Sequence, residues 1–70
     1  MMNKYYLLEA LQAKLTGEKA VHEANIRVYL ESAAGIGEHA RIVDAVESEV
    51  EKLATAQEKW ETVTGLLDIL

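Results

Sequence analysis

The chain contains no cysteine and no proline, and only four glycines among its 70 residues. The lack of cysteine excludes disulfides, thiolate metal ligands and cysteine nucleophiles. Without proline no residue forces a helix to end, and half of the residues are hydrophobic, so the composition favours long helices. A chain this short buries only about 60% of the surface that its unfolded form exposes, so an isolated monomer has marginal stability.

Positive charge is also scarce, with 7 basic against 12 acidic residues and a net charge of −5. This balance argues against a nucleic-acid partner, because binding nucleic acid requires neutralisation of phosphates. No apolar run approaches the roughly 18 residues of a membrane span, and no charged-then-apolar leader opens the chain. We therefore expect a soluble, unprocessed, cytoplasmic protein with no nucleic-acid and no membrane partner.

The second half of the chain is predicted to form one helix over about residues 38–66. Apolar or small residues recur there in a 3-4 alternation for more than three heptads, which is typical of the seam of a coiled coil. The residues expected on this seam are Val43, Val46, Val50, Leu53, Gln57, Trp60, Thr64 and Leu67.

The first half is predicted to form a helix over about residues 3–34, with a looser stripe that departs from the heptad at Leu15. A single internal glycine costs a helix only about 1 kcal/mol, so Gly17 need not interrupt it. Alternatively, Thr16 caps a new helix and the chain forms a three-helix bundle. The stripe comprises Leu8, Leu11, Leu15, Lys19, His22, Ile26, Tyr29 and Ala33.

The sequence Gly35-Ile36-Gly37 is predicted to form the turn between the two helices. Gly35 suits the left-handed position after a helix end, and Ile36 can then pack back on Leu30. Gly37 or His39 caps the second helix. So short a link makes the helices antiparallel neighbours, which gives an all-α helical hairpin as a single domain over residues 1–70.

An antiparallel hairpin with its turn at Ile36 also predicts which residues face each other. Equal rise along both helices gives facing residues whose numbers sum to about 72. His22 is thus expected beside Val50, and Leu11 beside Trp60.

Each helix carries a second apolar stripe next to the seam. A lone hairpin would leave these side chains in water, so we expect a homodimer that forms a four-helix bundle, or failing that a tetramer. The expected oligomer interface is Leu7, Val21 and Val28 on the first helix, interrupted by Lys14, and Ile42, Ala56, Val63, Leu66 and Leu70 on the second, interrupted by Glu49.

The polar residues do not suggest an enzyme. His22 and His39 lie at different heights of the hairpin, so one subunit cannot bring them together, and we expect no catalytic, cofactor-binding or metal residues. His22 is interpreted as a seam residue satisfied locally, with a pH-sensitive or metal-binding role as the alternative. Glu47 and Glu51 share a solvated face while Glu49 lies nearly opposite, and the alternative for this face is an acidic docking surface.

The stretch from Val28 to His39, followed by Ile42-Val43 and a heptad helix, resembles a group of small uncharacterised proteins of T-even-like marine phages. These are similar in having a Gly-Ile-Gly-Glu-His turn between a helix that ends in Val-Tyr-Leu and a second, charged helix. Ala40-Arg41 departs from the proline or serine and the acid of that group. The resemblance implies no activity; it implies a phage accessory protein in the host cytoplasm or the virion.

Two functional hypotheses follow. The first is a non-enzymatic helical interaction or structural protein that binds itself and a host or virion protein. The second is an acidic regulatory or inhibitory protein that occupies a basic surface of a nucleic-acid-handling host enzyme. Rising ionic strength should weaken only the second kind of binding.

Overall fold

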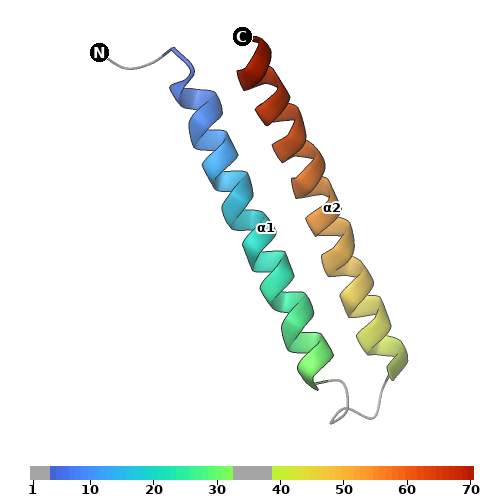
Figure 1. Cartoon of the computed structure of the whole chain (residues 1–70). Coiled ribbons are helices and arrows are strands. Elements are labelled where there is room, and N and C mark those ends of the chain that lie inside the picture. Colours follow the sequence, from blue (N-terminus) through green and yellow to red (C-terminus); the bar gives the residue numbers. More distant parts are fainter. Residues whose placement is uncertain (1–3, 33–38) are drawn as a thin grey trace.

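The computed structural model describes residues 4–32 and 39–70, which form two antiparallel helices lying side by side (Figure 1). Helix α1 spans Tyr6–Ser32, and helix α2 spans His39–Ile69. The start of α1 and the end of α2 lie at the same end of the molecule. The described ranges contain no strand, so the all-α hairpin is confirmed. The expected turn at Gly35-Ile36-Gly37 lies outside the described residues.

Helix α1 runs without a break through Gly17, so the three-helix alternative is wrong. Thr16 does not cap a new helix; its hydroxyl donates to the Gln12 carbonyl at 2.9 Å, one turn back within α1. The cost of one glycine, about 1 kcal/mol, is spread over a 27-residue helix that has no proline and is rich in strong helix formers.

The hairpin is a thin rod with little interior. It measures 56 × 18 × 12 Å, and its radius of gyration is 16.2 Å, against about 11 Å for a compact domain of this length. Among the described residues only Leu15, Ala56 and Val63 are buried hydrophobics. Two helices side by side leave most of each helix surface facing outward.

Burial along α1 follows a strict 3-4 alternation, which the predicted stripe missed at one position. Leu11, expected on the seam, is 39% exposed, and Gln12 occupies the seam position instead. The Gln12 amide nitrogen donates to the Thr64 hydroxyl at 2.9 Å, so the polar side chain is satisfied between the helices. The seam residues of α1 are the buried Leu15 and the half-buried Leu8, Gln12, Lys19, His22, Ile26 and Tyr29.

Helix α2 turns a different side toward α1 than expected. Six of the eight predicted seam residues are half-buried: Val46, Leu53, Gln57, Trp60, Thr64 and Leu67. The prediction is wrong for Val43 and Val50, which are 65% and 47% exposed. The alternating seam positions are instead Ile42, Glu49, Ala56 and Val63.

This rotation of α2 has a simple physical reason. Two heptad patterns both contain Val46, Leu53, Trp60 and Leu67 of α2. The expected pattern alternates them with Val43, Val50, Gln57 and Thr64, and the observed pattern alternates them with Ile42, Glu49, Ala56 and Val63. The observed pattern buries Ala56 and Val63 fully and leaves Gln57 and Thr64 half-buried beside them, and burial of apolar surface is the favourable term. The observed pattern also places the Glu49 carboxylate at the seam, which is unfavourable unless the carboxylate has a partner there.

The same rotation corrects the α2 part of the expected oligomer interface. Ala56 and Val63 are buried inside the hairpin and are not accessible to a second copy, whereas Ile42 and Leu66 are half-buried and keep part of their surface accessible. Leu70 remains exposed. On α1 the expected interface residues Leu7, Val21 and Val28 are all exposed.

The expected pairing is close to the observed one at the middle of the hairpin and differs toward the open end. His22 contacts Glu49, one residue from the expected Val50, whereas Trp60 reaches Thr16 instead of Leu11. At the open end the Tyr5 hydroxyl donates to the Leu70 carbonyl.

Candidate functional site

A pair of titratable residues lies at the middle of the seam. The His22 Nδ1 atom is 2.7 Å from Glu49 Oε2, and the two side chains are 20% and 14% exposed. The hydrogen bond from His22 is the main cause that lowers the pKa of Glu49 below its usual range; Asn25 and Lys52 act in the same direction, while partial burial opposes them. Glu49 is therefore an ionised acceptor for the imidazole N–H, and His22 is satisfied locally.

A second polar group surrounds Trp60. The Lys19 ammonium lies 4.6 Å from the centre of the indole ring, a cation–π distance, and the indole N–H donates to the Thr16 hydroxyl at 3.1 Å. In the described parts of the chain no buried side-chain nitrogen or oxygen lacks a hydrogen bond. The pairs Gln12–Thr64, His22–Glu49 and Trp60–Thr16 thus join the two helices along the seam.

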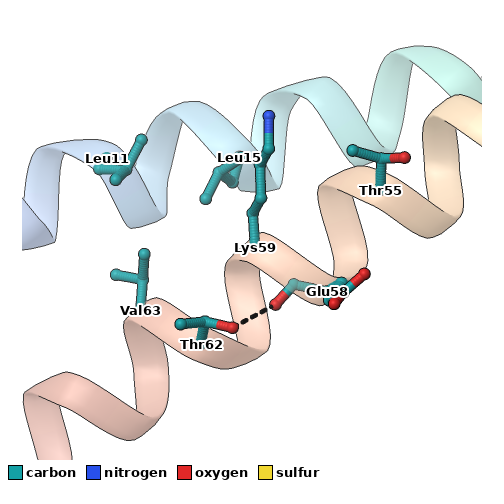
Figure 2. A pocket seen from close by; sticks show the side chains of 7 residues that line it. All are labelled: Leu11, Leu15, Thr55, Glu58, Lys59, Thr62 and Val63. Carbon is teal, nitrogen blue, oxygen red and sulfur yellow. Dashed lines mark hydrogen bonds between the residues drawn. The ribbon is translucent and has the colours of Figure 1, made fainter.

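One flank of the hairpin carries an open groove of about 400 Å³ (Figure 2). Its floor is apolar, with Leu11 and Leu15 from α1 and Val63 from α2. At its rim the Thr62 hydroxyl donates to the backbone carbonyl of Glu58 at 2.9 Å, and Lys59 extends toward α1. The groove is therefore an apolar recess whose rim carries Thr55, Glu58, Lys59 and Thr62.

The structure offers no set of metal ligands for His22. Within residues 4–32 and 39–70 no three histidine, aspartate or glutamate side chains group closely enough to hold a metal ion. The side chain of His39 lies outside the described part. Neither described helix is long and apolar enough to cross a membrane.

The surface of α2 opposite α1, which we call the α2 outer face, is dominated by acidic residues. As the sequence predicted, Glu47 and Glu51 are exposed there while Glu49 points to the other helix. Its thirteen exposed residues are Arg41, Asp44, Glu47, Ser48, Glu51, Ala54, Thr55, Glu58, Glu61, Thr62, Gly65, Asp68 and Ile69. Seven of them are charged, and six of these seven are acidic.

The opposite surface of the molecule, which we call the α1 outer face, has a contrasting composition. Only three of its twelve exposed residues are charged, and five are alanine or glycine in a 3-4 alternation. The seven-residue spacing of Leu7, Val21 and Val28 predicted an apolar stripe on this face but did not reveal the small residues beside it. The face consists of Tyr6, Leu7, Ala10, Ala13, Lys14, Gly17, Ala20, Val21, Ala24, Arg27, Val28 and Glu31.

Comparisons with protein-family models, with curated proteins and with solved structures found no match to this chain. Geometry and surface chemistry are therefore the basis for assigning a function.

Proposed function

We propose that the protein is a non-enzymatic helical interaction module whose first partner is a second copy of itself. The observation that carries this proposal is the amount of apolar surface that the hairpin leaves in water. The exposed large hydrophobic side chains on the described residues are Tyr6, Leu7, Leu11, Val21, Val28, Leu30, Val43, Val50, Ile69 and Leu70.

The accessible area supports the same conclusion. The hairpin exposes 5345 Å², whereas a compact monomer of 7.8 kDa exposes about 4,400 Å². The difference is close to the roughly 800 Å² that each partner contributes to a standard protein interface. A dimer that removes this excess gives each subunit the surface of an ordinary globular protein.

Sedimentation equilibrium at micromolar concentration tests the proposal. We expect a mass of twice 7.8 kDa. The mass should persist in 1 M salt, because apolar association is not screened by ions. A folded monomer at that concentration, with full helical circular dichroism, would refute self-association.

A second candidate function is supported by the α2 outer face. Six exposed carboxylates, Asp44, Glu47, Glu51, Glu58, Glu61 and Asp68, project from one side of one helix. Such a surface suits an acidic inhibitor or regulator that docks on a basic protein surface, such as that of a nucleic-acid-handling host enzyme. In this case binding to a basic protein should weaken steeply between 50 mM and 500 mM salt, and Glu51→Lys together with Glu58→Lys should abolish it without changing the mass of the dimer.

A further inference from the structure

We propose that the dimer forms through α1 alone: the α1 outer faces of two copies pack antiparallel about a two-fold axis that passes next to Gly17. The acidic α2 outer faces then lie on the two outer sides of the assembly. This inference rests on the proposed self-association and names the surface that carries it.

The exposure of large apolar side chains favours the α1 outer face as the dimer interface. Leu7, Val21 and Val28 recur at multiples of seven residues on the α1 outer face, and all three are more than half exposed. On the α2 outer face Ile69, at the very end of the helix, is the exposed large hydrophobic. An apolar strip interrupted only by Lys14 therefore runs along the α1 outer face, whereas the other exposed large hydrophobics of helix α2, Val43 and Val50, lie outside the α2 outer face.

Charge opposes the alternative pairing of two α2 helices. Within Tyr6–Ser32 the four acidic and three basic residues nearly balance, whereas His39–Ile69 carries seven acidic and three basic residues. Two α2 helices in contact would bring like charges within the Debye length of about 8 Å, and such repulsion opposes association. The α1 outer face meets a copy of itself with little net charge.

The positions of the alanine and glycine residues on the α1 outer face indicate where the two-fold axis passes. Ala10 and Ala24 lie seven residues before and after Gly17, and Ala13 and Ala20 lie four before and three after it. In an antiparallel pair centred on Gly17, Gly17 faces Gly17 and Ala10 faces Ala24, while Ala13 faces Val21 and Ala20 faces Lys14 of the second copy, so each facing pair near the axis contains a small residue. A side chain at Gly17 would meet nothing within 4 Å in the monomer, so the space beside it is free for the second backbone. A self-complementary patch of this kind is what a two-fold interface requires.

Cysteine crosslinking tests the arrangement, since the native chain has no cysteine to interfere. Disulfide formation requires Cα atoms within about 7 Å. We expect Gly17→Cys to crosslink with itself under mild oxidation, and Ala10→Cys to crosslink only when it is mixed with Ala24→Cys. Glu58→Cys, on the α2 outer face, serves as the control and should stay uncrosslinked. Crosslinking of Ala10→Cys with itself would show a parallel pair and overturn the proposal.

A matched pair of valine substitutions provides a second test without oxidation. Val28→Glu on the α1 outer face and Val43→Glu on α2 start from similar exposures of 59% and 65%. We expect Val28→Glu to weaken the dimer at least about tenfold in sedimentation equilibrium, because it places a carboxylate close to Leu7 of the second copy. Val43→Glu should leave the dissociation constant unchanged, and both variants should keep their helical circular dichroism.

The outcomes separate this inference from the proposed function. A wild-type dimer that resists Val28→Glu but dissociates with Val43→Glu would overturn the α1 interface and leave self-association intact. A wild-type chain that sediments as a folded monomer would overturn both.

Discussion

Leu15 is the side chain on which the contact between α1 and α2 depends most. It is 2% exposed and is the largest fully buried side chain among the described residues. Leu15→Ala removes its buried methyl and methylene groups and leaves a cavity at the floor of the groove. Losses of about 2–5 kcal/mol are typical for this substitution in a packed core.

The structure places the expected loss at the lower end of that range, about 2–3 kcal/mol. The groove beside Leu15 is already open, and the partly exposed Leu11 at its floor can move toward the vacated space. For a small domain with a urea m-value of about 1 kcal/mol/M, the unfolding midpoint should fall by about 2–3 M. Urea unfolding followed by circular dichroism measures this, at one fixed protein concentration because self-association adds to the apparent stability.

Leu30→Ala provides the matched control. It makes the same chemical change on the same helix, at a side chain that is 65% exposed, and should alter the unfolding free energy by no more than about 0.5 kcal/mol. Equal losses for Leu15→Ala and Leu30→Ala would refute the conclusion that the core of the hairpin lies at Leu15.

Three further predictions concern the polar seam and the helix backbones. His22→Leu should lower the melting temperature because it leaves Glu49 at the seam without its partner, which lies 2.7 Å away in the wild type. His22→Leu combined with Glu49→Leu should restore or exceed the wild-type melting temperature. A higher melting temperature for His22→Leu alone would contradict the pairing. The pKa of Glu49 is lowered in the folded state, so the ionised carboxylate stabilises the fold above the unfolded pKa of about 4.3. This stabilisation is lost as the pH falls through the lower pKa of the folded state. In thermal melts between about pH 5 and 2, Glu49→Gln should therefore lose less stability than the wild type. Gly17→Pro should cost about 3 kcal/mol or more in urea unfolding, whereas Gly65→Ala, where an added methyl group meets nothing within 4 Å, should stabilise α2 by about 0.5–1 kcal/mol.

The sequence by itself determined that the chain forms two long antiparallel helices. Helix propensity and the absence of proline act locally, so they are readable without knowledge of the packing. The half-buried positions of Val46, Leu53, Trp60 and Leu67 belong to this class. The continuity of α1 through Gly17 does not, because the sequence left a break at Thr16 open and the structure excluded it. The exposure of Leu7, Val21 and Val28 also agrees with the apolar stripe that the sequence placed outside the seam.

Only the tertiary structure decided how far each helix is rotated about its own axis. On α2 two heptad patterns compete, and the choice depends on the total burial along both helices rather than on any one residue. That choice exposes Val43 and Val50, buries Val63 and brings Glu49 to His22. A charged seam residue becomes acceptable only when its partner comes from the other helix, and no local pattern contains that information.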